Sequence, residues 1–578
     1  MKEGIPMDYR QEYQRWLDMF ARDEATVKEL TSIAGDEKEI EDRFYTELSF
    51  GTAGMRGVIG AGLNRMNVYN VRRATKGLAM YLKDAGIAQR GVAIAYDSRH
   101  FSDVFAKQAA LVLAQNGVRA YLFDALRPVP VLSYAVRHLN AAAGIVVTAS
   151  HNPPQYNGYK VYAEDGAQLG PEAAGEVTRY IRSLDFPECE PMDERQALDQ
   201  GLLKIIGNAE VDDDYIAMIK RLSLRPELLA KEGPNLKIVY TPLHGSGNVP
   251  VRRMLRELGV THVSIVKEQE LPDGSFPTVT APNPEDPAAF KLAIPLAEQV
   301  GATVVFGTDP DCDRMGVAVK DKQGVFHTLT GNQIGCLLLS HVLESRRLNG
   351  TLPKNGAAVK SIVSTEMAKA IARDYGVTFF DVLTGFKFIG EKIQQFSETG
   401  EYTFLFGFEE SFGFLSGTSV RDKDGVNASL LLTEAACVAM SEGTTLYDKL
   451  QKLYEKYGYY TEKVVSVTLP GKDGVQKMKD IMAGLRADPP KALAGLSVTA
   501  VRDYQSGERT ACDGSRTKLD TPPSNVLYFE LENDNWVCIR PSGTEPKIKL
   551  YVNTKEASAE KSAELNKKLG DAAQALMA

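Results

Sequence analysis

The sequence predicts an α/β protein of several domains with mostly parallel sheets, and three observations lead to this expectation. The chain has 578 residues, which corresponds to about three to five domains at roughly 100–200 residues per domain. Strand-like runs alternate with helix-like patterns, as where GVAIAYDSR (91–99) precedes FAKQAALVLAQNG (105–117). The apolar runs are almost continuous, which is typical of strands that are covered on both faces of a parallel sheet.

Composition excludes several classes of protein. Hydrophobic residues make up 44% and charged residues 25% of the chain, as in ordinary soluble proteins. The net charge of -8 argues against a nucleic-acid partner. No apolar stretch reaches the ~18 residues of a membrane span, and the start MKEGIPMDYRQEYQRW lacks a signal core. The six cysteines form no CxxC pair, so we expect a cytoplasmic protein without a membrane partner.

Three polar clusters each follow an apolar run, at Ser150, at Asp309–Asp313 and at Glu409–Ser411. In open α/β sheets, ligands bind beyond the carboxyl ends of the strands. Each cluster falls in a different segment of ordinary domain size. The pattern therefore predicts three related α/β domains that contribute one loop each to a shared cleft.

The last segment has a different character. It contains KVVSVTLPG, a helix-like KMKDIMAGL, two further strand-like runs and a final amphipathic stretch, KEASAEKSAELNKKLGDAAQALMA. We interpret it as a smaller α+β domain. The predicted domains are residues 1–205, 206–325, 326–460 and 461–578.

Ser150 lies in the stretch GIVVTASHNPPQYNGYK (144–160). A serine at a strand exit most often caps a helix or bonds within a turn, and this segment has no GxSxG elbow. A phosphate-carrying role gains weight only if a metal site and phosphate-binding groups exist elsewhere. We expect the two prolines and Asn157-Gly158 to hold the turn that follows the serine.

The second cluster predicts a metal site. Asp309, Asp311 and Asp313 alternate after an apolar run, and in an extended loop such residues point to one side. Three carboxylates suit Mg²⁺, a hard ion that prefers oxygen ligands. The alternative is a solvated acidic turn, which repulsion between like charges disfavours. The spacing lacks the glycine and glutamate of an EF-hand.

The remaining clusters are weaker when each is taken alone. Glu409, Glu410 and Ser411 offer acceptors for sugar hydroxyls, although many loops share this composition. The residue types of RPSGTEPK (540–547) indicate an anion-binding loop. The alternative is a charged hairpin turn. Arg56 ends the glycine-rich loop FGTAGMRG, which is neither a P-loop nor GxGxxG. Lys160 and Lys387, like Arg56, could each be a solvated surface cation.

Together and in this order, these loops resemble those of the α-D-phosphohexomutase family, of the phosphoglucomutase/phosphomannomutase kind. TASHNPPQYNGYK (148–160) is similar to the phosphoserine loop of that family, DPDCDR (309–314) to its metal loop, FEES (408–411) to its sugar-binding loop and RPSGTEP (540–546) to its phosphate-binding loop. FGTAGMRG, YDSR, TPLHGSG and TGFK add further agreement. The resemblance covers nearly the whole chain and implies four domains around a central cleft, the last one smaller.

The resemblance also implies a role for each matching residue. Ser150 would carry the phosphoryl group, and it would ligate Mg²⁺ together with Asp309, Asp311 and Asp313. Glu409 and Ser411 would hold sugar hydroxyls, and Arg314, beside the aspartates, would be a further substrate-binding residue. The implied holders of the non-reacting phosphate are Arg540, Ser542, Gly543 and Thr544, and the remaining catalytic residues are Lys160, His151, Arg56 and Lys387.

The activity implied by the resemblance is a phosphoglucomutase reaction. Glucose 1-phosphate and glucose 6-phosphate would interconvert through a phosphoserine enzyme, with glucose 1,6-bisphosphate as intermediate and activator. Phe412-Gly413 replace a histidine found in some members of the family, so a phosphopentomutase or a phosphomannomutase remains an alternative. A metal-dependent phosphatase and a sugar-phosphate sensor are rivals of other classes. The expected partners are small sugar phosphates, and the expected state is a monomer or weak dimer.

Overall fold

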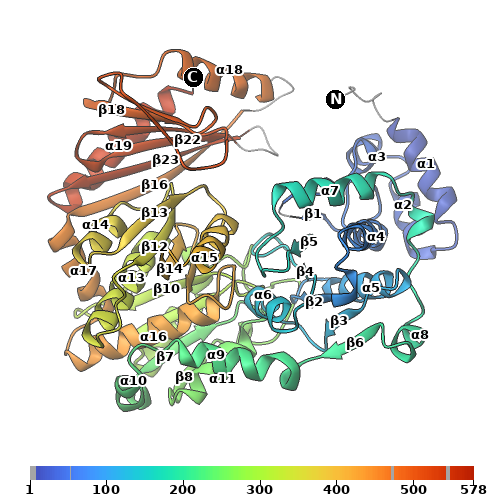
Figure 1. The fold of residues 1–578 in the computed structure, drawn as a ribbon, viewed down its shortest axis with the longest axis horizontal. Coiled ribbons are helices and arrows are strands. Elements are labelled where there is room, and N and C mark those ends of the chain that lie inside the picture. The colour runs from blue at the N-terminus through green and yellow to red at the C-terminus, as the bar shows by residue number, and fades with distance from the viewer. Residues whose placement is uncertain (1–7, 53, 470–473, 542–546, 578) are drawn as a thin grey trace.

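The computed structural model describes residues 8–52, 54–469, 474–541 and 547–577, and these contain four sheets that follow one another along the chain (Figure 1). We call the part of the chain around each sheet domains I to IV. Domain I lies on the right and domain IV at the upper left, with domain III below domain IV and domain II along the bottom (Figure 1). The α/β class with a smaller, different last domain is confirmed. The predicted boundaries after residues 205, 325 and 460 stay predictions.

Within the described part of the chain, three helices precede the first sheet, and the sequence analysis did not predict them. They are α1 (Tyr9–Met19), α2 (Glu24–Ser32) and α3 (Glu37–Phe44), each capped by an aspartate side chain. Trp16 is fully buried among them. Its ring lies 5.7 Å from that of Tyr69 and 5.2 Å from that of Phe186, centroid to centroid. This aromatic cluster joins the helices to domain I.

The sheet of domain I has the order β1-β5-β4-β2-β3-β6. The strands β2, β3, β4 and β6 are parallel. At one edge, β5 pairs antiparallel with β4 on one side and with β1 on the other. Val92 and Ile94 of β2 belong to the core formed with α4, α5 and α7, and Ala93 and Ala95 face α6. The bounds are β1 (Met55–Val58), β2 (Val92–Tyr96), β3 (Ala120–Phe123), β4 (Ala143–Val147), β5 (Tyr156–Tyr162), β6 (Leu203–Ile206), α4 (Val68–Asp84), α5 (Ser102–Gln115), α6 (Val129–His138), α7 (Pro171–Arg182) and α8 (Glu194–Asp199).

Domains II and III repeat this plan, with the orders β11-β10-β9-β7-β8 and β13-β12-β14-β15. The strands and helices of domain II are β7 (Lys237–Thr241), β8 (His262–Ile265), β9 (Val304–Thr308), β10 (Met315–Lys320), β11 (Phe326–Leu329), α9 (Asp213–Arg221), α10 (Pro226–Glu232), α11 (Asn248–Glu257) and α12 (Ala293–Val300). Those of domain III are β12 (Gly356–Ser361), β13 (Thr378–Val382), β14 (Thr403–Glu409), β15 (Gly413–Ser416), α13 (Gly331–Leu348), α14 (Met367–Asp374), α15 (Lys387–Thr399), α16 (Gly425–Ser441) and α17 (Leu446–Tyr457).

The three predicted loops occupy equivalent places in the three sheets. Each connects a strand of the parallel centre to the antiparallel strand beside it, namely β4 to β5, β9 to β10 and β14 to β15. The expectation of mostly parallel sheets therefore holds only for the sheet centres. The strand that leaves each loop turns back along its neighbour, which keeps the loop short at the carboxyl end of the parallel strand.

One apolar core runs through domains I, II and III. Its central element is α16, whose residues from Gly425 to Ala439 are all buried. A mostly apolar helix that is buried on every side lies inside the protein, and α16 contacts α10, α11, α13 and β15. The shared core holds the three loops in fixed relative positions.

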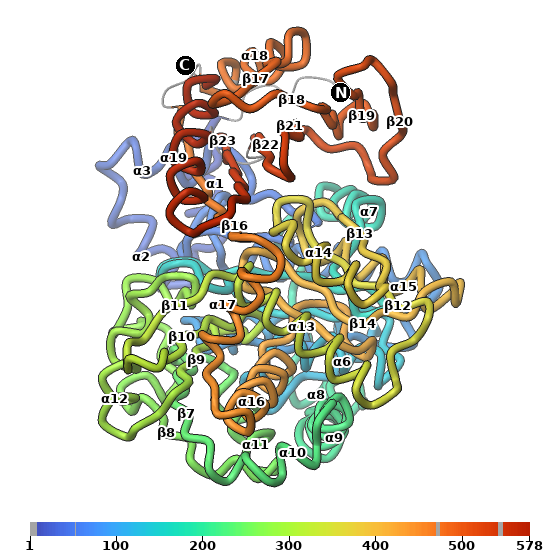
Figure 2. The backbone as a smooth tube through the Cα atoms, turned by 90° about the vertical axis from the view of Figure 1, so that its left-hand side faces the viewer, coloured from blue at the N-terminus to red at the C-terminus, as the bar shows by residue number. Residues whose placement is uncertain are grey.

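Domain IV is built on an antiparallel sheet of order β16-β23-β22-β21-β18-β19-β20, with β17 paired to β18. Figure 2 shows it above the other domains, and β16 enters it directly after α17. The final amphipathic stretch forms the helix α19, which packs across β16 and β23. The bounds are β16 (Tyr459–Thr468), β17 (Ala492–Leu493), β18 (Leu496–Asp503), β19 (Glu508–Ala511), β20 (Arg516–Lys518), β21 (Leu527–Leu531), β22 (Trp536–Pro541), β23 (Lys547–Glu556), α18 (Gly474–Ala487) and α19 (Ala559–Ala575).

Short helical segments complete the chain, at Ala88–Arg90, Phe186–Cys189, Asn208–Asp212, Gly233–Asn235, Lys267–Gln269, Pro287–Phe290 and Glu532–Asp534. Among the residues that the structure describes, no helix combines the length and the apolar character needed to cross a bilayer.

Candidate active site

A cavity of about 640 Å³ is lined by residues from all four domains. Domain I contributes Arg56, Ser150, His151, Lys160 and Gln168, domain II contributes Glu285, Asp313 and Arg314, domain III contributes Glu409, Glu410, Ser411 and Lys423 among others, and domain IV contributes Arg540 and Lys549 among others. Most of the residues predicted from the sequence thus meet in one place.

Ser150 follows β4 at a left-handed position, with φ of 51°. Its Oγ donates a hydrogen bond to Asp309 Oδ2 at 2.7 Å and lies 3.2 Å from His151 Nδ1. Its backbone N–H donates to Thr148 Oγ1 at 2.8 Å, which fixes the turn. The serine hydroxyl therefore contacts one carboxylate of the aspartate cluster that the sequence predicts as the metal site.

The prediction that Asn157-Gly158 forms the following turn is wrong. Both residues lie within β5, and the turn is formed earlier, between β4 and β5. Gly158 is needed for close packing, because a Cβ there would lie 2.5 Å from the carbonyl oxygen of Thr148. The glycine thus allows β5 to pass directly against the backbone just before Ser150.

Asp309, Asp311 and Asp313 bring carboxylate oxygens within 4.8 Å of one another, and all three are buried. The expected extended loop is wrong, since the chain turns at residues 310–311 and Cys312 has φ of 50°. Asp311 Oδ1 and Asp313 Oδ1 accept no hydrogen bond from the described residues. Buried free carboxylate oxygens of this kind suit a divalent cation. The donor set therefore fits a metal ion.

Two lysines offset the charge of the aspartates. Lys160 Nζ lies 3.0 Å from Asp311 Oδ2, and Lys423 Nζ lies 3.0 Å from Asp313 Oδ2. Burial and the neighbouring Asp311 raise the pKa of Asp309. Burial also raises the pKa of Asp311, but the positive charge of Lys160 lowers it by more. The pKa of this carboxyl therefore lies below its usual range. The site thus carries opposite charges at close range before any ligand binds.

Lys423 was missed by the sequence interpretation. It belongs to the run Arg421-Asp422-Lys423-Asp424, in which all four residues are buried, although a charge run is usually solvated. Asp422 accepts hydrogen bonds from Lys423 Nζ at 2.9 Å and from Tyr162 Oη at 2.8 Å. The one signal in the sequence was the position of this run, directly before the strongly apolar α16.

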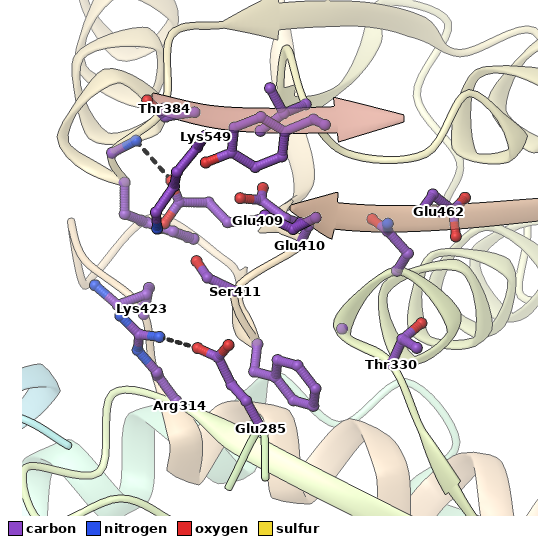
Figure 3. Close-up of a pocket in the computed structure, with 18 of the residues that line it drawn as sticks. Glu285, Arg314, Thr330, Thr384, Glu409, Glu410, Ser411, Lys423, Glu462 and Lys549 are labelled. Carbon is purple, nitrogen blue, oxygen red and sulfur yellow. Dashed lines mark hydrogen bonds and ion pairs between the residues drawn. The ribbon is translucent and has the colours of Figure 1, made fainter. Parts of the chain in front are cut away.

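Arg314 connects the metal loop to the sugar loop. Its backbone forms an antiparallel bridge with Gly413, and its N–H donates to Asp309 Oδ1 at 3.1 Å. Its guanidinium forms an ion pair with Glu285, a residue that the sequence interpretation did not select. Figure 3 shows Arg314 and Glu285 pointing toward each other at one wall of the cavity, with Lys423 beside Arg314.

The two adjacent glutamates of the sugar loop have different environments. Glu409 accepts a hydrogen bond from the backbone N–H of Gly385 at 2.7 Å, and burial raises its pKa to about 7. The carboxylate of Glu410 accepts from Ser361 Oγ at 2.7 Å, which ties it to domain III. Ser411 projects between the Arg314–Glu285 pair and the glutamates (Figure 3).

Arg540 and Lys549 form the contribution of domain IV to the cavity. They are direct neighbours across β22 and β23, so their side chains lie on the same face of the sheet. Lys549 was not predicted. Two cations side by side favour an anion, as expected of a phosphate site. Ser542, Gly543 and Thr544, which were predicted with Arg540, lie outside the described residues.

The other predicted catalytic residues are placed as follows. Arg56 lines the cavity and donates to Asn152 Oδ1 at 3.1 Å. His151 lines it as well, and burial, with Arg314 nearby, lowers its pKa to about 2. Lys387 does not line the cavity. It begins α15, and its Nζ lies 4.8 Å from the centre of the Phe388 ring.

Comparison with known proteins agrees with this geometry. The family models for domains I, II, III and the C-terminal domain of phosphoglucomutase/phosphomannomutase match residues 47–188, 213–324, 330–457 and 467–568. The phosphoglucomutase of Staphylococcus epidermidis is 39% identical over 542 residues, which cover 93% of this chain and 96% of the relative.

Two solved structures are similar in fold. The open form of the Paramecium phosphoglucomutase pp63/parafusin gives a TM-score of 0.69 at 17% identity and covers 92% of this chain and 94% of that one. The Aspergillus fumigatus N-acetylphosphoglucosamine mutase, in complex with GlcNAc-6P and magnesium, gives 0.50 at 14% identity and covers 96% and 99%. The order of the loops, the four domain matches and the identity to a full-length relative lead to one conclusion: the chain belongs to the phosphoglucomutase/phosphomannomutase family.

Proposed function

We propose that the chain is a phosphoglucomutase, which interconverts glucose 1-phosphate and glucose 6-phosphate. The observation that carries the proposal is the contact of Ser150 Oγ with Asp309 Oδ2, at 2.7 Å, inside a cavity lined by all four domains. A hydroxyl at a buried carboxylate cluster suits phosphoryl transfer, because transfer needs mainly positioning and electrostatic support. The identity to phosphoglucomutases favours glucose as the sugar.

The residues that we assign to the reaction begin with Ser150 as phosphoryl carrier. Asp309, Asp311 and Asp313 would hold Mg²⁺, which would offset the charge of the phosphoryl group when bound. The magnesium in the related N-acetylphosphoglucosamine mutase supports this choice of ion. Arg540 and Lys549, together with Ser542, Gly543 and Thr544, would hold the phosphate that does not react.

In the first half-reaction, the 6-hydroxyl of glucose 1-phosphate attacks the phosphorus of phosphoserine. The new P–O bond forms on the sugar, the bond to Ser150 Oγ breaks, and a proton passes from the hydroxyl to the serine oxygen. Glucose 1,6-bisphosphate results, and the reverse transfer from its 1-position restores phosphoserine. The candidates to handle this proton are Lys160 and His151, whose Nδ1 lies 3.2 Å from Ser150 Oγ.

Glu409 and Ser411 are assigned to the sugar hydroxyls, and Arg56 and Arg314 to the charged groups of the ligand. Lys387 remains a more distant candidate, since it would have to move to reach the cavity. We assign the enzyme to the cytoplasm, which its net negative charge and its six free cysteines support. We expect it to be a monomer or a weak dimer.

The test is the rate of glucose 6-phosphate formation from glucose 1-phosphate, with Mg²⁺ and a trace of glucose 1,6-bisphosphate. Ribose 1-phosphate and mannose 1-phosphate are measured in parallel. Fast glucose turnover that EDTA abolishes supports the proposal. Faster turnover of ribose or mannose would retain the mechanism and change the substrate, whereas steady release of inorganic phosphate would indicate a phosphatase.

A further inference from the structure

Glu285 sits on a loop of domain II that is held firmly in place. Its backbone N–H donates to Asn283 Oδ1 at 3.1 Å. The preceding Pro284 packs against β10, where a Cβ at Gly316 would lie 2.2 Å from the carbonyl oxygen of Pro284. This close approach is possible only at a glycine, and it brings the loop beside the first residues of β10. Glu285 is thereby placed next to Arg314.

The guanidinium of Arg314 has two carboxylate neighbours. Its Nη1 pairs with Glu285 Oε1, and its Nε lies 3.8 Å from Asp313 Oδ1. Nε is buried and donates to no acceptor among the described residues. The backbone of Arg314 is bridged to Gly413 and is therefore fixed. Only the side chain can move from one carboxylate toward the other.

The position of the Arg314 guanidinium affects the aspartate cluster. Asp313 Oδ1 accepts no hydrogen bond from the described residues, so it is one of the oxygens available to a cation. A guanidinium that moved from 3.8 Å into hydrogen-bond distance would occupy this oxygen with a fixed positive charge. The same movement would withdraw the guanidinium from the cavity wall, where a phosphate or sugar oxygen can meet it.

We propose that Glu285 is a positioning residue, which holds the guanidinium of Arg314 toward the ligand cavity and keeps it from closing to hydrogen-bond distance on Asp313, one of the aspartates that would hold the metal. The inference rests on the proposed function in one respect, namely that the ligand is a sugar phosphate. It assigns to Glu285 a double effect, on metal affinity and on substrate affinity, without any contact to the reacting atoms.

The first test uses Glu285→Gln in the full-length protein, with Mn²⁺ alone as the probe of metal binding. Loss of a charge-assisted hydrogen bond of this kind should weaken Mn²⁺ binding roughly tenfold. The KM for glucose 1-phosphate should rise by about the same factor, and kcat should change less. The control is Glu270→Gln, which weakens pairs with Arg252 at 2.6 Å and with Lys267 at 2.7 Å in the same domain, outside the cavity lining. It should change neither quantity.

A double variant separates positioning from a structural role. The Arg314→Gln variant has no guanidinium at this position that could pair with Asp313. Adding Glu285→Gln to it should therefore leave the Mn²⁺ affinity unchanged. An equal loss in both backgrounds would overturn the inference, and so would unaltered Mn²⁺ affinity in Glu285→Gln itself. Thermal melting checks that each variant folds. If Glu285→Gln does not fold, Glu285→Asp takes its place, with the same expected directions.

Failure of the proposed function gives a different result. Wild-type protein that binds Mn²⁺ but does not convert glucose 1-phosphate would contradict the function alone. The Mn²⁺ measurements would still decide the role of Glu285.

Discussion

Lys423 Nζ lies 3.0 Å from Asp313 Oδ2, and this contact joins domain III to the metal loop of domain II. The same ammonium lies 2.9 Å from Asp422 Oδ1, while Asp422 Oδ2 accepts hydrogen bonds from Tyr162 and Gln168 of domain I. Three domains therefore meet at one buried charge network. A buried ion pair of this kind depends on every partner, because each remaining charge would be left without compensation.

The first prediction concerns Lys423→Met. The substitution leaves Asp313 and Asp422 buried without their cation, so the free energy of unfolding should fall by about 3–5 kcal/mol. Urea unfolding measures it. Lys568→Met is the control, because its pair with Glu564 on α19 is exposed and should contribute less than about 1 kcal/mol. Equal effects of the two variants would contradict the network described here.

The second prediction concerns the phosphoryl carrier. Ser150→Ala should lower mutase turnover by several orders of magnitude and should remove the covalently bound phosphoryl group, as read by mass spectrometry. The melting temperature should stay close to that of the wild type. Ser133→Ala is a matched control, since Ser133 is equally buried but bonds to Gly166 outside the cavity. Normal turnover in Ser150→Ala would refute the assignment.

The third prediction is a metal-dependent stability. A cation that binds the folded aspartate cluster stabilises the protein by about 2.7 kcal/mol at a concentration of 100 times its dissociation constant. Adding Mg²⁺ to protein treated with EDTA should therefore raise the melting temperature. Asp311→Asn should reduce this rise, whereas Asp571→Asn on the exposed part of α19 should leave it intact. A rise of the same size in Asp311→Asn would place the ion elsewhere.

The fourth prediction concerns pH. Burial raises the pKa of Glu409 to about 7, against roughly 4.3 in an unfolded chain. Between these values the folded state holds more protons than the unfolded state, so the free energy of unfolding should fall as the pH rises from about 4 to 7. Glu409→Gln removes this slope. The difference in the free energy of unfolding, variant minus wild type, should therefore be larger at pH 8 than at pH 5. The increase should be roughly 2–4 kcal/mol. Denaturant unfolding at both pH values checks it, and a constant difference would contradict the expected titration.

The main loops could be predicted from the sequence because each concentrates its chemistry within a few consecutive residues. Ser150, the aspartates from Asp309 to Asp313 and the Glu409–Ser411 segment each end an apolar strand, and that position alone predicts a shared ligand site. The equivalent positions of the loops in three sheets confirm the reasoning.

The unpredicted residues are those whose partners are distant in the sequence. Glu285, Lys423 and Lys549 lie in no motif, and only the fold brings them to the cavity. Local backbone geometry was the second source of error. Asn157-Gly158 reads as a turn by its residue types, but packing against Thr148 makes it part of β5. The aspartates converge through a turn with a left-handed Cys312, which alternation in an extended chain could not anticipate.

The N-terminal aromatic cluster has a consequence for how the protein is made. Arg15, next to Trp16, pairs with Asp185, and the two are separated by 170 positions in the chain. At about 5–20 residues per second, the ribosome needs on the order of ten to thirty seconds to synthesise that interval. During this time α1 has emerged while the ring of Phe186, against which Trp16 packs, does not yet exist. The contacts of Trp16 with Phe20, Phe44 and Tyr69 can form early in synthesis. The side of the indole that packs against Phe186 stays uncovered until that residue has been made, so the aromatic cluster is completed late.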